Sequence, residues 1–410
     1  MKNTSIILFV LIALTISSNA QTTGWSTQTN PTTQTLYGVA NSNSNIWVAV
    51  GDAGTIIRSS DSGITWTTVT SPVADALHGV SLHGNFGLAV GVSGRVLRST
   101  NSGISWTEMT RPTTRILYAV SITDVSSIAT GQEGTLLWSS DIGITWTSHT
   151  AGTASSILGV SANGMTAVGS GGQGAMVMSV SGGSSWGLTI IGNQLTFFYG
   201  VSFPSPSTGW TVGATTSPGY VIAKSIDGGF VWSAQTAPIT DQLFGVSFAA
   251  MDTGTAVGGN GTIIHTVNSG TTWVNQTSGT IQTLNGVSFA NTSLGIAVGA
   301  AGTILRTSSG GITGVNKTTN DVPKNFALQQ NYPNPFNPST KISYELPKNS
   351  FVTLRIFDIL GNEVKELVNE EQNAGTHLLE FDGSNLSSGT YFYKLETSEF
   401  TDTKKMILLK

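Results

Sequence analysis

The sequence predicts an all-β protein, and three observations support this prediction. Short runs of β-branched and aromatic residues alternate with glycine-containing turns along the chain of 410 residues, 49 of which are glycine. No stretch shows the apolar period of an amphipathic helix. Finally, Trp66, Trp106, Trp146 and Trp186 follow one another at intervals of 40 residues, which marks a structural repeat.

The repeat is organised around residues 59–66, which read Ser-Ser-Asp-Ser-Gly-Ile-Thr-Trp. Asp61 can accept hydrogen bonds from the backbone of its own turn, and Gly63 provides a conformation that other residues resist. Trp66 begins the next strand, where its flat side chain can be buried. Six weaker copies follow, headed by Asn101 (with Trp106), Asp141 (Trp146), Ser181 (Trp186), Asp227 (Trp232), Asn268 (Trp273) and Ser309 (no Trp). We call these seven segments the repeat turns.

The two ends of the array complement each other. One step beyond Trp273 the chain has Gly314 where a tryptophan is expected, and one step before Trp66 lies Trp25, which has no repeat turn in front of it. We therefore expect residues 25–29 to supply the last strand of the seventh unit. Closing the ring in this way removes the free sheet edges of an open array.

Each unit is expected to contain four short strands, which in the first unit begin near Leu36, Ile46, Thr55 and Trp66. The prediction for residues 21–315 is therefore a seven-bladed β-propeller closed by an N-terminal strand. The segment 59–66 resembles the Asp-box of bacterial-neuraminidase-repeat propellers, Ser-x-Asp-x-Gly-x-Thr-Trp, at every position.

The array is also similar to the photosystem II assembly factor family of propellers. This resemblance is carried by motifs such as Gly79-Val80-Ser81, Ala89-Val90-Gly91 and Gly103-Ile104-Ser105-Trp106. Both resemblances imply the propeller fold. The photosynthetic role of the second family is not carried over, because a fold does not by itself define a function.

Residues 1–20 have the pattern of a secretory signal peptide. Lys2 precedes the apolar run 6–16, and Ser18-Asn19-Ala20 suits cleavage after Ala20. The alternative, an uncleaved membrane anchor, needs a longer apolar run, and no other segment is expected to cross a membrane. The chain has no cysteine, so the exported protein would fold without disulfides. With a net charge of −4 and no basic stripe, we expect no nucleic-acid partner.

The chain changes character after Ile312. Residues 316–325 form a polar linker, and residues 326–410 contain alternating strands that predict a small immunoglobulin-like β-sandwich. Hairpin turns are expected at Gly361-Asn362 and at Asp382-Gly383.

Four motifs in this segment are specific: Asn-Tyr-Pro-Asn-Pro-Phe-Asn-Pro at 331–338, Phe-Asp-Ile-Leu-Gly at 357–361, Ser-Gly-Thr-Tyr at 388–391, and the tail 404–410. Through them residues 326–410 resemble the type A C-terminal sorting domain of type IX secretion cargo. The resemblance implies an envelope of the Bacteroidetes type, recognition by the type IX machinery and export to the surface or beyond. It also implies that the domain is usually removed and the protein anchored to surface polysaccharide. The alternative is a generic exported sandwich module.

Candidate binding residues gather where the innermost strands begin, at one mouth of the central channel. Equivalent positions there are Tyr37, His78, Tyr118, Leu158, Tyr199, Phe244 and Asn285. Loops at the same mouth add Asp52, Arg95, Arg111, Arg115 and Glu133, all in blades one to three. Arginine presents a planar fork for a carboxylate and tyrosine a flat face for a sugar. We expect His78, Arg95, Arg115, Tyr118 and Glu133 to bind an acidic glycan or a peptide carboxylate. The alternatives are aromatic rings that only plug the channel and a solvated patch of charges.

The function that these patterns favour is an exported, non-catalytic binding or adhesion module that takes a surface glycan or a protein. The first alternative is a hydrolase of the sialidase type, which needs three arginines from separate blades around the pocket, together with paired carboxylates. Arg58, Arg98 and Arg306 precede repeat turns, at the end of the blade away from that mouth. A structural surface-layer component is the second alternative. We expect no metal site and no cofactor, since the five histidines are scattered.

Overall fold

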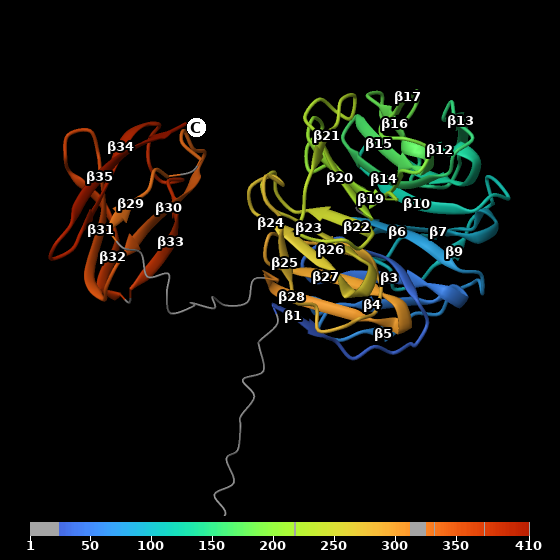
Figure 1. Ribbon diagram of the computed structural model, residues 1–410, viewed down its shortest axis with the longest axis horizontal. Helices are drawn as coiled ribbons and strands as arrows, with labels where there is room; N and C mark the ends of the chain where they lie inside the picture. Colours follow the sequence, from blue (N-terminus) through green and yellow to red (C-terminus); the bar gives the residue numbers. More distant parts are fainter. Residues whose placement is uncertain (1–23, 217–218, 312–324, 332, 373, 410) are drawn as a thin grey trace, which may run out of the picture. The chain divides into compact units, whose positions relative to one another are not determined.

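The computed structural model describes residues 24–216, 219–311, 325–331, 333–372 and 374–409. The chain divides into two compact units, residues 1–314 and 315–410, and each is described by itself (Figure 1). The predicted signal peptide and residues 316–324 of the predicted linker lie outside the described residues. In the part that the structure describes, no helix has the length and apolarity needed to cross a membrane.

The described residues of the first unit form seven antiparallel four-stranded sheets, in agreement with the predicted blades. Blade one contains β2 (Leu36–Asn41), β3 (Trp47–Gly51), β4 (Ile56–Ser59) and β5 (Thr67–Thr68). Blade two contains β6 (Leu77–His83), β7 (Phe86–Gly91), β8 (Val96–Ser99) and β9 (Thr107–Glu108). Blade three contains β10 (Leu117–Ile122), β11 (Ser127–Gly131), β12 (Thr135–Ser139) and β13 (Thr147–Thr150).

The remaining blades follow the same order. Blade four contains β14 (Ile157–Asn163), β15 (Thr166–Gly171), β16 (Ala175–Ser179) and β17 (Gly187–Ile190). Blade five contains β18 (Phe197–Ser202), β19 (Gly209–Ala214), β20 (Tyr220–Ser225) and β21 (Ser233–Gln235). Blade six contains β22 (Leu243–Phe248), β23 (Gly254–Gly258), β24 (Ile263–Thr266) and β25 (Val274–Gln276). Blade seven contains β26 (Leu284–Phe289), β27 (Gly295–Gly299), β28 (Ile304–Gly311) and β1 (Gly24–Thr27).

Among the described residues, one-turn 3₁₀ segments join the second and third strands in six of the seven blades. They are η1 (Asp52–Gly54), η2 (Val92–Gly94), η3 (Gln132–Gly134), η4 (Gly172–Gly174), η5 (Gly259–Gly261) and η6 (Ala300–Gly302). The middle residue of each has a positive φ, as at Glu133 (φ 54°) and Asn260 (φ 51°). This backbone turns the chain sharply, so the middle side chains stand at the same end of every blade that has such a turn.

The core of the propeller lies between neighbouring blades. Every residue of the second strand β3 is buried, because a blade covers each face of its sheet. One cluster joins blade one to blade seven, where Trp47 and Trp66 share a core with Ile296 and Ile304. The ring is therefore closed by apolar packing between the first and the last blades.

The innermost strands approach one another closely, and glycine makes this possible. A Cβ atom on Gly38 would lie 2.9 Å from the carbonyl oxygen of His78 in the next blade. A Cβ atom on Gly286 of blade seven would lie 2.9 Å from the carbonyl oxygen of Tyr37 in blade one. Both distances are below normal contact, so a larger residue would push adjacent blades apart.

The predicted closure by the N-terminal strand is confirmed. Strand β1 pairs with β28 in antiparallel register, with Thr27 opposite Leu305. Trp25 is 1% exposed and packs edge-to-face on Phe289, with ring centroids 5.9 Å apart. Its indole Nε1 donates a hydrogen bond of 2.7 Å to Oε1 of Gln276 in blade six. The strand thus completes blade seven and fastens it to the preceding blade.

The repeat turn at Asp61 is held by the network expected from its sequence. Oδ1 of Asp61 accepts hydrogen bonds from the backbone N–H of Ile64 (3.2 Å) and Thr65 (2.9 Å), and Oδ2 accepts the Thr65 hydroxyl (2.6 Å). Ser59 donates its hydroxyl to Asp61 and accepts the N–H of Gly63. Partial burial raises the pKa of Asp61, but these hydrogen bonds outweigh it and lower the pKa to about 2. The pKa of Asp141 is lowered to about 2 by an equivalent network.

Repeat turns also connect the blades to one another. Nε of Arg58 donates to the carbonyl oxygen of Ser102 in the next turn, at 2.8 Å. Nε of Arg98 donates to Ile142 O in the same way, and Nε of Arg306 in blade seven donates to Ser62 O in blade one, each at 2.8 Å. The three arginines that precede repeat turns therefore have structural partners.

The propeller is expected to lose stability as the pH falls from about 4 toward 2. Asp61 and Asp141 have native pKa values below the unfolded value of about 3.9. Their stabilisation is therefore present above the unfolded pKa and is lost as the pH falls through the native one. Urea midpoints measured between pH 2 and 7 test this. The matched variant Asp61→Asn with Asp141→Asn copies the amide-based turn of Asn101. Its urea midpoint should fall less between pH 4 and pH 2 than that of the wild type. An equal fall of the midpoint in the two proteins would contradict the assignment.

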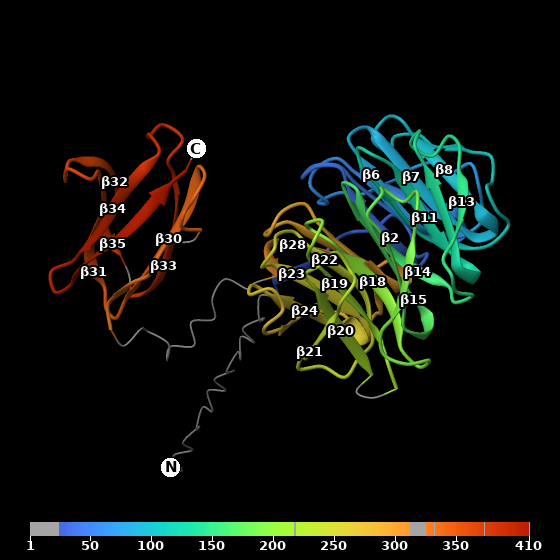
Figure 2. The same cartoon turned by 90° about the horizontal axis from the view of Figure 1, so that it is seen from above.

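The described residues of the second unit form a two-layered β-sandwich, as predicted (Figure 2). One sheet contains β29 (Ala327–Leu328), β30 (Ser339–Leu346) and β33 (Gly375–Asp382). The other contains β32 (Glu363–Gln372), β31 (Ser350–Phe357), β34 (Gly389–Glu396) and β35 (Thr401–Leu408). The layers enclose their own core, which includes Tyr344, Tyr393 and Phe381. Every residue of this core belongs to the second unit.

One of the two predicted hairpins in this unit is wrong. Gly361 and Asn362 do join the paired strands β31 and β32. Asp382 and Gly383, however, lead from β33 in one sheet to β34 in the other, and β33 pairs with β30 instead. The Asp-Gly pair indicates a turn, but the choice of the next sheet is made by packing of the whole sandwich.

The motif at 331–338 fastens the C-terminal strand. Asn334 accepts the N–H of Ile407 through Oδ1 at 2.9 Å, and Phe336 exchanges backbone hydrogen bonds with Ile407 and Leu409. The buried Asn331 donates its N–H to the hydroxyl of Tyr393 at 2.7 Å. The side chains add specific contacts: Nδ2 of Asn331 donates to Pro333 O at 3.0 Å and to Thr340 Oγ1 at 2.9 Å, and the ring of Phe336 is buried in the core of the unit.

Candidate functional site

The seven positions expected around the channel are all β-bulges. In every inner strand the register shifts at one residue, which is left without a partner in the second strand. The skipped residues are Tyr37, His78, Tyr118, Leu158, Tyr199, Phe244 and Asn285. A bulge redirects a side chain out of the regular alternation. All seven are partly exposed. We call this end of the inner strands, with the 3₁₀ turns and the loops that connect the blades, the mouth.

The structure brings the expected aromatic residues of blades one to three together. The His78 ring lies 4.9 Å from that of Tyr37 and 5.7 Å from that of Tyr118, between centroids, and both pairs are tilted. We call these three rings the aromatic arc. Elsewhere on the mouth, the ring of Tyr199 lies 5.2 Å from that of Phe244. The arc therefore presents adjoining ring surfaces from three successive blades.

Asp52 stands beside the aromatic arc. Its Oδ1 accepts a hydrogen bond of 3.1 Å from the Tyr37 hydroxyl. Burial raises the pKa of Tyr37, and the Asp52 carboxylate raises it further. Burial lowers the pKa of His78, and Asp52 opposes this effect. The net pKa shifts of Tyr37 and His78 therefore both favour the uncharged form of the ring.

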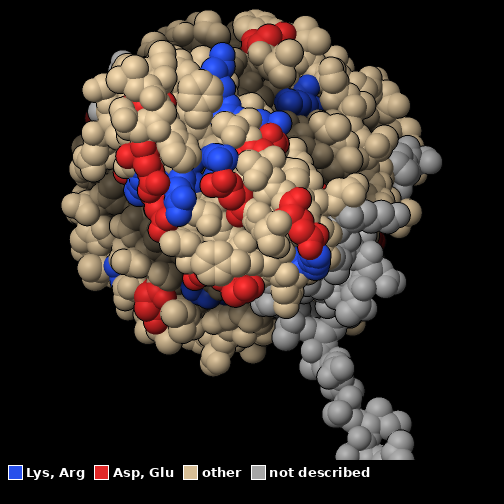
Figure 3. Space-filling view, turned by 90° about the vertical axis from the view of Figure 1, so that its left-hand side faces the viewer, with Lys and Arg blue, Asp and Glu red and all other residues tan. Residues whose placement is uncertain are grey.

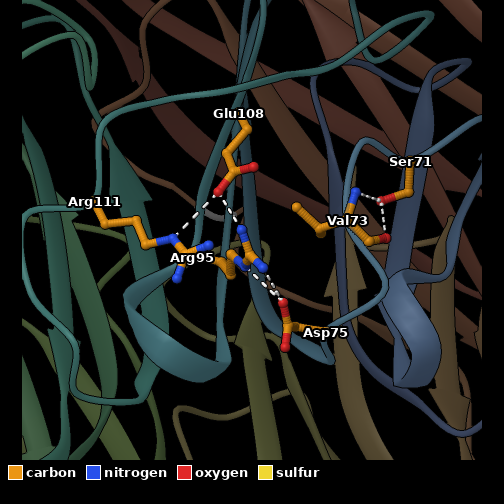
Figure 4. Close-up of polar contacts among 6 residues, drawn as sticks. All are labelled: Ser71, Val73, Asp75, Arg95, Glu108 and Arg111. Atoms are coloured by element: carbon orange, nitrogen blue, oxygen red, sulfur yellow. Dashed lines mark hydrogen bonds and ion pairs between the residues drawn. The ribbon is translucent and has the colours of Figure 1, made fainter.

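Arg95 lies at the centre of an ion-pair cluster (Figure 4). Its Nε donates to Oδ2 of Asp75 at 2.6 Å, and its Nη1 donates to Oε1 of Glu108. Arg111 donates to the same Glu108 oxygen at 3.3 Å. Hydrogen bonds from Glu108 and Asp75 raise the pKa of Arg95. The planar fork of Arg95 is thus already directed at two carboxylates of the protein.

The other predicted charged pair also meets within the protein. Nη2 of Arg115 lies 2.8 Å from Oε2 of Glu133, and both side chains are about half exposed. Such an exposed pair contributes about 1 kcal/mol of stability or less. Arg115 and Glu133 therefore remain accessible at the mouth, whereas Arg95 is largely covered.

Sequence reasoning missed three carboxylates of the mouth: Asp75, Glu108 and, in the loop between blades five and six, Asp241. Asp75 lies in the loop between blades one and two, and Glu108 ends the short outer strand β9. Both come within reach of Arg95 when blade two folds, because β9 pairs with β8, which directly follows Arg95, and the loop that carries Asp75 leads into β6 of the same blade. The sequence offers one indication of their role. Charged residues are rare in this propeller, so oppositely charged residues near each other in the repeat are candidates for ion pairs.

The described residues contain no group of three or more histidines, aspartates or glutamates arranged to hold a metal ion. In the second unit, which faces the viewer in Figure 3, basic and acidic side chains are interspersed on the surface. What the mouth offers chemically is therefore flat rings, hydrogen-bonding groups and a few carboxylates.

Comparison with known proteins identifies the second unit. Residues 330–409 match the family model described as the secretion system C-terminal sorting domain. The chain therefore carries an export address of the type IX secretion system, which directs it to the cell surface or the extracellular space. No curated protein matches the chain.

Solved structures resemble the first unit. One is YCF48 bound to a D1 peptide, with 18% identity, a TM-score of 0.58, and coverage of 70% of this chain and 97% of that one. Another is YCF48 from Cyanidioschyzon merolae, with 18% identity, a TM-score of 0.57, and coverage of 69% of this chain and 98% of that one. The WD40 β-propeller domain of Doa1 matches with 11% identity, a TM-score of 0.55, and coverage of 70% and 97%. At these identities the likeness establishes the propeller fold alone. The protein is thus an exported β-propeller with a C-terminal sorting domain.

Proposed function

We propose that the propeller is a non-catalytic binding module, which acts at the mouth on a surface glycan or an extracellular protein. The observation that carries the proposal is the set of bulged inner-strand residues, which bring the rings of Tyr37, His78 and Tyr118 together at one end of the channel. Ring faces of this kind can bind sugars and side chains by packing against them, without any covalent reaction. A propeller of this fold, YCF48, has been solved with a peptide bound.

The partners of the arginines also favour binding over glycoside hydrolysis. A sialidase-type site needs arginines free to clamp the substrate carboxylate. Here Arg58, Arg98 and Arg306 donate to backbone carbonyls, and those at the mouth pair with carboxylates of the protein. The engagement of these arginines within the protein therefore supports the binding proposal.

The proposal predicts that changes to the aromatic arc remove ligand capture without unfolding the protein. In the double variant His78→Leu with Tyr118→Leu, both positions copy blade four, where Leu158 occupies the same bulge. Because the fold already accepts leucine there, the melting temperature should change little. Capture of surface glycans or proteins from the host envelope by the purified full chain should fall by about tenfold or more, the equivalent of about 1.4 kcal/mol.

Asn260→Ala provides the control for this experiment. Asn260 occupies the 3₁₀ turn of blade six and donates to Asp241 at 2.7 Å, away from the aromatic arc. The Asn260→Ala variant should capture as much envelope material as the wild-type chain does. If the leucine double variant captures the same material in the same amount as the wild type, the mouth is not the binding face.

A further inference from the structure

The charges at the mouth do not balance. Among the described residues of the propeller, five carboxylates and three guanidinium groups lie at this end: Asp52, Asp75, Glu108, Glu133, Asp241, Arg95, Arg111 and Arg115. Each arginine is in an ion pair with Asp75, Glu108 or Glu133. The net charge is therefore negative, and two carboxylates have no basic partner among the described residues.

These two carboxylates are held by neutral groups. Asp52 accepts the Tyr37 hydroxyl, and Asp241 accepts Nδ2 of Asn260 at 2.7 Å and the Thr262 hydroxyl at 2.9 Å. Both side chains are partly exposed. These donors bring no positive charge, so both carboxylates can still attract a cation. An acidic ligand would instead meet these charges while every nearby arginine is already engaged.

Asp52 adjoins the aromatic arc, and this combination selects for a cation. The faces of aromatic rings attract ammonium and guanidinium groups placed within about 6 Å of the ring centre. The tilted rings of Tyr37, His78 and Tyr118 adjoin one another, with Asp52 at one end of the row. A lysine or arginine side chain laid along the rings could place its charge near this carboxylate.

We propose that the mouth binds a basic segment of an extracellular protein, with a lysine or arginine side chain held between Asp52 and the aromatic arc. This inference rests on the proposed function and deepens it by naming the ligand class. It replaces the acidic ligand expected from the sequence, because the arginines on which that expectation depended are paired within the protein. Lysine and arginine are the cations that proteins present, so the segment belongs to a polypeptide rather than to an acidic glycan.

The test compares three soluble probes on the purified full chain. One is a capped Gly-Ser peptide with three lysines, the second is the same peptide with three glutamates, and the third is a sialylated oligosaccharide. Fluorescence polarisation at low salt should give at least about tenfold tighter binding of the lysine peptide than of either acidic probe. Raising the salt should weaken it, since accessible charges are screened.

Two variants that remove the same charge locate the site. Asp52→Asn should weaken binding of the lysine peptide by about fivefold to tenfold. Asp252→Asn is the matched control, because Asp252 is exposed in the connection between β22 and β23, at the end of the blades away from the mouth. It should leave the affinity within about twofold. Tyr37→Phe keeps the ring and the carboxylate, so it should retain most of the binding.

Tighter binding of an acidic probe, equal effects of Asp52→Asn and Asp252→Asn, or no binding of the lysine peptide at millimolar concentration would each overturn this inference. The binding-module proposal would survive these results if the full chain still captured envelope material in a manner sensitive to His78→Leu with Tyr118→Leu. It fails separately if that capture is absent or insensitive to the variant.

Discussion

A chain that ends at Thr319 is expected to fold its propeller and to stay in the periplasm of its native host. The sorting domain, residues 330–409, would be absent, and with it the address that the type IX machinery recognises. Folding should be unaffected, because the core of the second unit contains only its own residues, from Leu328 to Leu408. Surface labelling and fractionation of the host measure the outcome. Surface exposure should fall to background.

The reciprocal fusion is the control for this prediction. Residues 320–410 joined to an unrelated periplasmic protein should carry that protein to the surface or the medium. A truncated chain that still reaches the cell surface would show that the propeller has another route, and the assignment of the sorting domain as the export address would be wrong.

Trp25→Ala should be strongly destabilising to the propeller. The change empties a site that is 1% exposed, removes the contact with Phe289 and leaves the Gln276 side chain without its indole donor. Replacing a buried tryptophan by alanine costs about 3–5 kcal/mol. The melting temperature should therefore fall by on the order of 10 °C. Thermal unfolding followed by circular dichroism provides the measurement.

Thr27→Ala is the matched control on the same strand. Thr27 is exposed opposite Leu305, so its replacement should change the free energy of unfolding by about 0.5 kcal/mol or less. If Trp25→Ala and Thr27→Ala shift the melting curve equally, strand β1 does not close the ring.

Much of the fold could be predicted because each blade repeats the same local chemistry. The spacing of the tryptophans located Trp25 in blade seven, since a circular array must complete the unit that lacks one strand. Equivalent positions in the repeat also located the bulged residues Tyr37, His78 and Tyr118, because the register shifts at the same place in each inner strand.

The pairing of charges at the mouth could not be predicted from the repeat. Asp75 and Glu108 meet Arg95 across a loop and an outer strand. Glu108 has no counterpart in the other blades, and Asp75 recurs only as Asp241 in blade six, where Thr262 stands in the place of Arg95. The repeat therefore did not indicate that the guanidinium group of Arg95 is paired with carboxylates of the protein. Likewise, the Asp382-Gly383 turn was evident, but the sheet that the next strand joins depends on the whole sandwich.

The most direct test of the central claim, binding at the mouth without turnover, is to incubate the purified full chain with captured envelope material and analyse both fractions. The account predicts that the wild-type chain retains its ligand intact, that His78→Leu with Tyr118→Leu releases it, and that no free sugar appears. Free sugar produced by the wild-type chain and lost in Glu133→Gln would contradict the account and identify the mouth as a hydrolase site.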